Sequence, residues 1–285
     1  MRSLPLYILT EDLSFFYRIN KELNKLKIPF KILNLNKINS SYQSIILTTR
    51  KEALLLEEKG SRSKILAYSD TDNFENYIIK IIAAVKIGYK DHYSEILFSV
   101  DPGKRTGLMI FLDEYYLYSY CCFKMDEVFS KIMKYIQCFQ SENKNDIKIT
   151  FKLGNGVLEL TLNLIKQIFS IYNGRKSMRI FLIDEFKSSK IKVNQKNKPH
   201  HVSKDELSAL ILALRDGIEI KQNEYDNLMK QYYKNRKIEV DIGGVKNEEG
   251  VYDKLALAEI VIKVIDGELT LKEASEELRL LNIKK

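Results

Sequence analysis

Cysteine is scarce in this sequence, and the few cysteines present are poorly placed for cross-linking. There are three among 285 residues: Cys121 and Cys122 are adjacent, and Cys138 follows further along the chain. Such a set forms neither a disulfide framework nor a C-x-x-C metal pair. We therefore expect a reduced, cytoplasmic protein that folds without covalent cross-links.

Long hydrophobic runs are missing as well. No stretch approaches the roughly eighteen uncharged apolar residues that span a bilayer, and the first residues lead into a short strand pattern instead of a signal sequence. We expect a soluble protein that does not associate with a membrane. The apolar content of 45% and the aromatic content of 11% are sufficient for real cores, and the length leaves room for two compact domains.

The charge balance favours a polyanionic partner. The net charge is +8 and the pI is about 9.1, which suits nucleic acid. Lysine-rich proteins of other functions share these values, so charge alone supports nucleic acid only weakly.

The first part of the chain, residues 1–92, alternates short apolar strands with helical patterns that stop at Pro29, Gly60 and Gly88. This alternation predicts a small parallel α/β domain of three layers. The domain contains no G-x-G-x-x-G, no P-loop and no cluster of histidine or cysteine. We interpret it as an interaction or substrate-positioning domain, with a structural role as the alternative.

The stretch 96–113 carries the first chemical signal. An apolar run ends on Asp101, a Pro-Gly turn follows, and a second apolar run comes soon after it. The predicted β-hairpin has a carboxylate at its mouth that can face a metal. Its glycine-bounded connection holds Lys104 and Arg105, so the backbone can come close to a phosphate. An ordinary hairpin with common turn residues is the alternative.

Residues 93–217 predict a mixed-sheet domain. Three strand patterns come first, and helices then alternate with strands, which gives the order βββαβαβα. Residues 218–285 predict a helical extension, beginning with a charged helix over 218–237. We expect its last two helices to pack on the core as a hairpin or to form a dimer, with half of a helix-turn-helix as the alternative.

Three motifs in the mixed-sheet domain are similar to those of one superfamily. Asp-Pro-Gly-Lys-Arg-Thr-Gly at 101–107 resembles a first motif in which an aspartate is followed by a glycine turn and Arg-x-Gly. Asp-Glu-Phe-Lys-Ser-Ser at 184–189 resembles a second, with Phe186 in place of an arginine, and 204–214 resembles a final helix motif. In order and spacing they resemble the RuvC and YqgF branches of the RNase H-like superfamily. The resemblance implies an RNase H-like α/β domain and binding of Mg²⁺ or Mn²⁺ by Asp101, Glu185 and Asp205, with Asp184 as a further candidate.

Metal-dependent phosphodiester cleavage requires carboxylates, the residue type that these motifs supply. Phosphodiester cleavage with two metal ions needs three or four carboxylates that converge on ions about 4 Å apart. Side chains alternate along a strand, so Asp184 and Glu185 point to opposite faces, and the motif favours Glu185. Asp205 lies in a first helical turn, where an acid is also favoured by the helix dipole. Glu206 is explained as a capping box with Ser203.

A lysine-rich stretch over 187–204 contains no acid. Together with Lys104 and Arg105 it can hold a phosphate backbone, and a solvated loop is the alternative. His200 and His201 could transfer protons there or simply be exposed. The candidate lysines in this stretch are Lys187, Lys190, Lys192, Lys196 and Lys198.

Two functions follow from these observations. The first is a Mg²⁺- or Mn²⁺-dependent nuclease that cleaves structured nucleic acid, either a DNA junction or an RNA precursor. The second is an RNase H-like scaffold that binds nucleic acid or a protein partner without cleavage. The fourth predicted strand has no acid at its end before Glu159, which favours the YqgF branch over true resolvases and leaves a metal site one ligand poorer. Junction cutting would require two active sites and therefore a homodimer.

Overall fold

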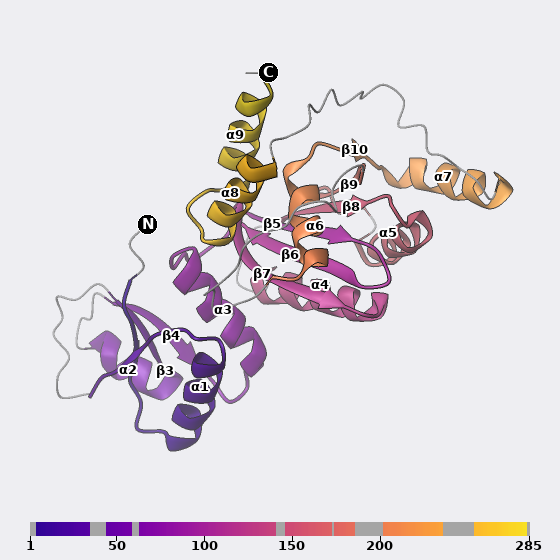
Figure 1. Ribbon diagram of the computed structural model, residues 1–285. Helices are drawn as coiled ribbons and strands as arrows, with labels where there is room; N and C mark the ends of the chain where they lie inside the picture. Colours follow the sequence, from indigo (N-terminus) through magenta and orange to yellow (C-terminus); the bar gives the residue numbers. More distant parts are fainter. Residues whose placement is uncertain are drawn as a thin grey trace. The chain divides into compact units, whose positions relative to one another are not determined.

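The structure is a computed structural model of the chain. It describes residues 4–34, 44–58, 63–140, 146–172, 174–185, 202–235 and 254–283. The described chain divides into two compact units, one ending at Asp91 and one beginning at His92 (Figure 1). No helix in the described ranges is long and apolar enough to cross a membrane.

The first unit is built on a parallel sheet with the strand order β2-β1-β3-β4. Its central strand β3 (Ile45–Thr49) is almost entirely buried, as is typical inside a parallel sheet that helices cover. The predicted small parallel α/β domain is thereby confirmed. The other elements are β1 (Leu6–Ile8), α1 (Leu13–Lys25), β2 (Lys31–Ile32), α2 (Arg50–Glu58), β4 (Lys64–Tyr68) and α3 (Phe74–Lys86).

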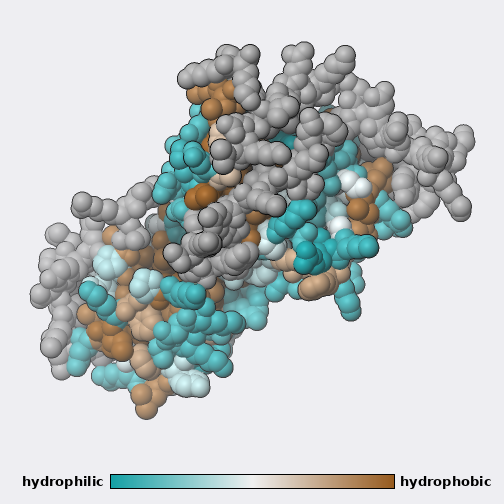
Figure 2. Space-filling view, viewed as in Figure 1, coloured by the Kyte–Doolittle hydropathy of each residue, from teal (hydrophilic) through white to brown (hydrophobic). Residues whose placement is uncertain are grey.

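Aromatic side chains join two helices to this sheet. Phe15 of α1 stacks on Tyr68 of β4 with ring centroids 5.5 Å apart, and both rings contact Tyr77 of α3. Hydrophobic residues, brown in Figure 2, also reach the visible surface of this unit. Isolated apolar side chains are normal on protein surfaces and indicate no site by themselves. The exposed ones include Leu13, Tyr17, Ile32, Leu54 and Leu55.

The second unit contains a mixed sheet with the strand order β10-β9-β8-β5-β6-β7. Strands β5, β6 and β7 form an antiparallel meander, and β8 and β9 run parallel to β5. With its helices this gives βββαβαβα, so the RNase H-like α/β fold is confirmed. The elements are β5 (Glu95–Asp101), β6 (Thr106–Leu112), β7 (Tyr115–Cys122), α4 (Met125–Gln140), β8 (Lys148–Gly154), α5 (Leu158–Tyr172), β9 (Met178–Ile183), α6 (Lys204–Leu214), β10 (Ile218–Glu219), α7 (Gln222–Asn235), α8 (Lys254–Ile265) and α9 (Leu271–Ile283).

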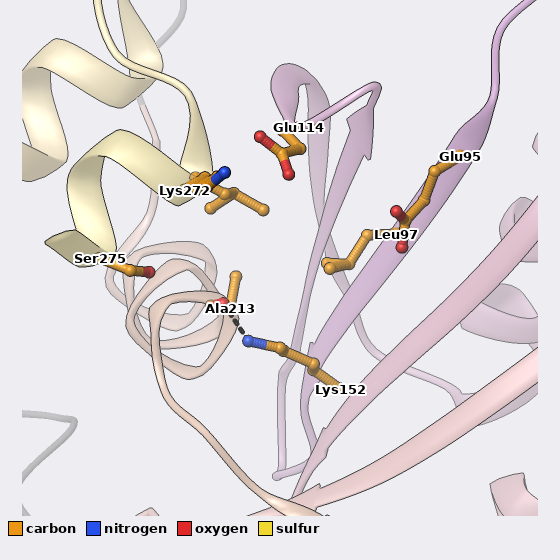
Figure 3. A pocket seen from close by; sticks show the side chains of 8 residues that line it. Glu95, Leu97, Glu114, Lys152, Ala213, Lys272 and Ser275 are labelled. Carbon is orange, nitrogen blue, oxygen red and sulfur yellow. Dashed lines mark hydrogen bonds between the residues drawn. The ribbon is translucent and has the colours of Figure 1, made fainter.

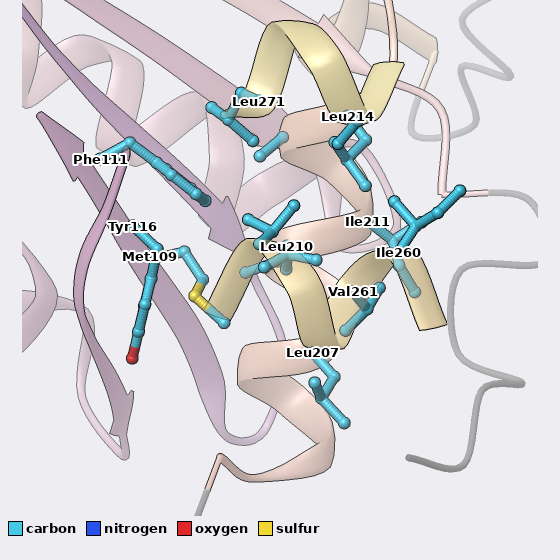
Figure 4. Close-up of a cluster of buried hydrophobic side chains, with 14 of the residues drawn as sticks. Met109, Phe111, Tyr116, Leu207, Leu210, Ile211, Leu214, Ile260, Val261 and Leu271 are labelled. Atoms are coloured by element: carbon cyan, nitrogen blue, oxygen red, sulfur yellow. The ribbon is translucent and has the colours of Figure 1, made fainter. Parts of the chain in front are cut away.

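Helix α6 lies in the middle of the core of this unit. All its residues from Glu206 to Leu214 are buried, because one side packs on the sheet and the other on the α8–α9 hairpin. Figure 4 shows Leu210 and Ile211 of α6 among side chains of β6, α8 and α9. The two last helices therefore pack on the core, and they complete the burial of the helix that carries Asp205.

One predicted element differs from the structure. The helix predicted over 218–237 begins only at Gln222, because β10 precedes it and pairs antiparallel with β9. Arg179 of β9 donates to both carboxylate oxygens of Glu219, at 3.0 and 2.8 Å. A strand of two residues is too short to show an alternating pattern in the sequence.

Candidate functional site

Asp101 is the last residue of β5 and lies directly across from Gly107 of β6. Cys121 of β7 continues this row on the other side of Gly107. Paired residues point to the same face of a sheet, and α6 covers this face. A methyl group at Gly107 would overlap the backbone of Asp205. The missing side chain therefore allows the start of α6 to lie against β6, and this brings Asp205 near Asp101.

Glu185 reaches the same place from the other half of the sheet. It follows β9, which is separated from β5 by β8. A side chain at either Gly154 or Gly156, at the end of β8, would overlap the Glu185 carboxylate. The Glu185 backbone N–H also donates to Oδ1 of Asn155 at 3.2 Å. We call Gly154 and Gly156 the glycine cradle, because their lack of side chains makes room for this carboxylate.

The carboxyl groups of Asp101 and Glu185 lie close enough for each to influence the pKa of the other. Burial raises the pKa of Asp101 to about 6, and the charge of Asp205 adds to this while a hydrogen bond with Ser208 opposes it. Burial raises the pKa of Glu185 to about 7, a hydrogen bond from the Gly156 backbone opposes it, and the charge of Asp101 adds to it. Interacting acids of this kind titrate as a pair.

One oxygen of this pair is unsatisfied. Oε1 of Glu185 is buried and has no hydrogen-bond partner among the described residues. Buried polar atoms in native proteins nearly always have a partner, so an exception calls for an explanation such as a bound ion or water.

Asp205 is held by two groups from the neighbouring strands. Its Oδ2 lies 3.0 Å from Nε of Arg105, and it accepts a hydrogen bond from Sγ of Cys121 at 3.6 Å. The Arg105 side chain is 54% exposed, so solvent screens the pair and it adds little stability. The effect of this ion pair is confined to the site, where Arg105 compensates the charge of Asp205.

The start of α6 is fixed by its own side chains and by the sheet. The predicted capping box is present: the Ser203 backbone N–H donates to Oε2 of Glu206, and the Glu206 N–H donates to Oγ of Ser203. Deeper in the core, Oγ of Ser99 in β5 donates to the Ala209 carbonyl oxygen at 2.6 Å. Asp205 therefore projects from a helix whose position along β5 is determined.

The carboxylates of this site could supply some of the ligands that a divalent cation needs. Among the described residues, no group of three His, Cys, Asp or Glu side chains is arranged to hold a metal ion. Asp101 and Glu185 nevertheless bring their carboxyl groups together, and one buried oxygen of Glu185 is left unsatisfied. Mg²⁺ is commonly held by one or two carboxylates together with water and substrate phosphates. Asp101 and Glu185 could hold such an ion, and Asp205 could join them only by leaving Arg105.

The structure places the other predicted residues away from this pair or leaves them undescribed. Asp184 is exposed, and its carbonyl oxygen accepts a hydrogen bond from Arg215 at 2.7 Å. Lys104 is exposed on the β5–β6 connection. The predicted lysines Lys187, Lys190, Lys192, Lys196 and Lys198, with His200 and His201, lie outside the described residues.

Sequence reasoning missed the glycine cradle and Ser208. A signal for the cradle was present, because glycine after a buried strand often marks a close approach of another group. In the sequence, Gly154 marks the end of the fourth strand of this domain, where no acid is found, but it does not show that Glu185 comes close. No such signal in the sequence indicated a role for Ser208, because its contact with Asp101 depends on how α6 lies on β5.

A pocket of about 170 Å³ lies at the other end of β5. It is lined by Glu95, the first residue of β5, and by side chains of β8, α6 and α9 (Figure 3). Nζ of Lys152 donates to the carbonyl oxygens of Ala213 and Arg215, both at 2.6 Å. Because Asp101 is the last residue of β5, the pocket and the carboxyl pair lie at opposite ends of this strand.

The solved structures that are similar to part of the chain include the following two. One is a crystal structure of Aa-Ago with externally bound siRNA, at 12% identity and a TM-score of 0.22, covering 64% of this chain and 35% of that chain. The other is Marinitoga piezophila Argonaute in complex with 5′ OH guide RNA and target DNA, at 12% identity and a TM-score of 0.25, covering 64% and 39%. This chain thus spans less than half of either protein. At this identity and TM-score, neither likeness assigns a family or an activity. No family model and no curated protein matches the sequence.

Proposed function

We propose that this chain is a divalent-metal-dependent phosphodiesterase that cleaves structured nucleic acid. The observation that carries the proposal is the half-buried carboxyl pair of Asp101 and Glu185, with the buried Oε1 of Glu185 left without a partner among the described residues. Two adjacent acids that are partly withdrawn from solvent are unfavourable in the folded state, and such groups concentrate at functional sites. A bound cation would compensate their charge and satisfy the free oxygen.

The residues of the site then have distinct roles. Asp101 and Glu185 would hold Mg²⁺ or Mn²⁺, which would supply an activated water and stabilise the charge that develops on the phosphate. Arg105 is positioned at the mouth of the hairpin, where its guanidinium can pair with a phosphate oxygen. When Arg105 turns to the phosphate, it releases Asp205, which becomes available as a third ligand. Binding of the substrate would in this way complete the carboxylate set.

The sequence motifs support the RuvC and YqgF type of this chemistry. The first motif supplies Asp101, the second supplies Glu185, and the final helix supplies Asp205, in that order along the chain. A four-way DNA junction and a structured RNA precursor are the corresponding substrates. The net charge of +8 supports a polyanion in either case.

A second function is favoured by two observations. Strand β8 ends in glycine without an acid, and Asp205 is already paired with Arg105. A site with only two available carboxylates could bind nucleic acid without cleaving it. The chain would then be a nucleic-acid-binding scaffold with an RNase H-like fold.

Cleavage of labelled substrates tests the first function against the second. Four-way DNA junction, duplex DNA and structured RNA are incubated with Mn²⁺ and the wild-type chain, Asp101→Asn, Glu185→Gln, or the control Asp184→Asn. We expect the wild type and the control to cut one substrate and the other two variants to be inactive. Binding without cleavage, with a steep dependence on salt, would favour the scaffold. Full activity of Asp101→Asn would contradict the proposed site.

A further inference from the structure

An aromatic side chain is exposed to solvent at the end of the sheet where Asp101 lies. Phe123 follows directly after β7 and is 75% exposed. Phenylalanine is normally among the most buried residues, and this one adds little to the core of its unit. Its place at the end of β7, on the sheet edge that carries Asp101, makes it a candidate for contact with the substrate.

The strand register places the end of β7 at the same end of the sheet as Asp101. Asp101, Gly107 and Cys121 form one cross-strand row, and Cys121 contacts Asp205. Phe123 lies two residues beyond Cys121, just past the end of β7, where the chain bends before α4 begins at Met125. It is therefore close along the chain to a side chain that contacts Asp205.

The opposite strand begins at the same point. Thr106 pairs with Cys122, so Arg105 and Phe123 are the residues just outside the last cross-strand pair of β6 and β7. Arg105 does point to the face of α6, because its guanidinium reaches Asp205. Phe123 and Arg105 thus both lie at the end of the β6–β7 ladder where Asp205 is held.

The charges around Phe123 suit a phosphate backbone. Four basic side chains are exposed on the three segments that meet at this edge: Lys104, Arg105, Lys124 and Lys204. The nearby Glu127 is engaged locally, since its Oε2 accepts a hydrogen bond from the Phe123 backbone N–H at 3.4 Å. An exposed ring among cations is the arrangement with which proteins bind unpaired nucleotides, stacking the base and pairing the phosphates.

We propose that Phe123 stacks on an unpaired nucleobase of the substrate while Arg105 and its basic neighbours hold the adjoining phosphates. This inference rests on the proposed function for the identity of the ligand as nucleic acid. It specifies the substrate further, because a fully paired duplex offers no free base face. The substrate is therefore a nucleic acid with a single-stranded or opened segment next to the bond that is cut.

The chain contains no tryptophan, which allows a direct measurement of stacking. Phe123→Trp would introduce the only indole, whose fluorescence can be excited apart from that of tyrosine and is quenched by a stacked base. The probes are a short single-stranded DNA oligonucleotide and its abasic counterpart of equal length and charge, both in EDTA to prevent cleavage. We expect saturable quenching by the first oligonucleotide and none by the abasic one.

Affinity measurements on a second variant complete the test. Phe123→Ala should bind the base-bearing oligonucleotide roughly ten-fold or more weakly and the abasic one as the wild type does. Ile171→Ala, which alters another half-exposed side chain of this unit, should bind both normally. Equal binding of base-bearing DNA by Phe123→Ala and wild type would overturn the inference, even if Asp101→Asn abolishes cleavage. Stacking without any cleavage would support the role of Phe123 and would contradict only the proposed nuclease activity.

Discussion

The carboxyl groups of Asp101 and Glu185 interact with each other although their strands are not neighbours in the sheet. Strand β8 runs between β5 and β9 and ends at Gly154, which has no side chain to fill the space. Glu185 therefore leans over the end of β8 to reach Asp101. Strand β8 has no acid at its end, and the carboxylate of Glu185, which follows β9, occupies the space there.

Filling the glycine cradle should remove Glu185 from the pair. In Gly154→Ala the new methyl group would overlap the carboxylate, which lies at the end of a flexible side chain, so we expect Glu185 to move away with a smaller loss of stability than a clash with the backbone would cause. Thermal unfolding with and without Mn²⁺ measures the consequence, because a ligand of the folded state raises the unfolding temperature. The wild type should gain stability from Mn²⁺ and Gly154→Ala should not.

The control for this experiment is Val157→Ala in the following turn, where the side chain is 40% exposed. It should keep the response to Mn²⁺. An undiminished response in Gly154→Ala would contradict Glu185 as a metal ligand.

Gly107→Ala should displace the start of α6. Its methyl group would overlap the Asp205 backbone, which cannot rotate away as a side chain can. We expect a loss of about 1–3 kcal/mol or more in the free energy of unfolding, measured with urea. Met109→Leu on the same strand conserves volume and should cost less than about 1.5 kcal/mol. Equal stability of Gly107→Ala and wild type would show that α6 does not rest on β6.

Lys152 should make the free energy of unfolding depend on pH in the alkaline range. Burial lowers the pKa of this lysine to about 8, below its value in the unfolded chain. Between these two values the unfolded chain binds more protons, so the free energy of unfolding rises as the pH increases through this range. Urea unfolding at pH values of about 7.5 and 9.5 compares the wild type with Lys152→Met. The wild type should gain stability relative to the variant, and parallel curves would disprove the assignment.

The α8–α9 hairpin should be required for the stability of the second unit. Ile260 of α8 is 1% exposed and belongs to the cluster around α6, so Ile260→Ala should cost about 2–5 kcal/mol. Leu280→Ala on α9 removes a side chain that is 61% exposed and should change stability by less than about 0.5 kcal/mol. Similar unfolding midpoints for both variants would mean that the hairpin does not stabilise α6.

Much of the fold was predictable because its signals are local. Apolar spacing located the helices and strands to within a few residues, and the βββαβαβα order followed from them. The Ser203–Glu206 capping box could be read directly, since both partners lie within one helical turn. The position of Asp101 at a strand end is equally local, because it depends only on where an apolar run meets a Pro-Gly turn.

The tertiary structure decided which of these groups meet. Sequence alternation separated Asp184 from Glu185, but only the sheet order and the empty end of β8 show Glu185 beside Asp101. The pairing of Arg105 with Asp205 likewise joins residues a hundred positions apart. Such contacts depend on strand order and on the absence of side chains at single positions, and neither leaves a periodic trace in the sequence. The sequence by itself determined the elements and the candidate acids, whereas their convergence into a site came from long-range packing.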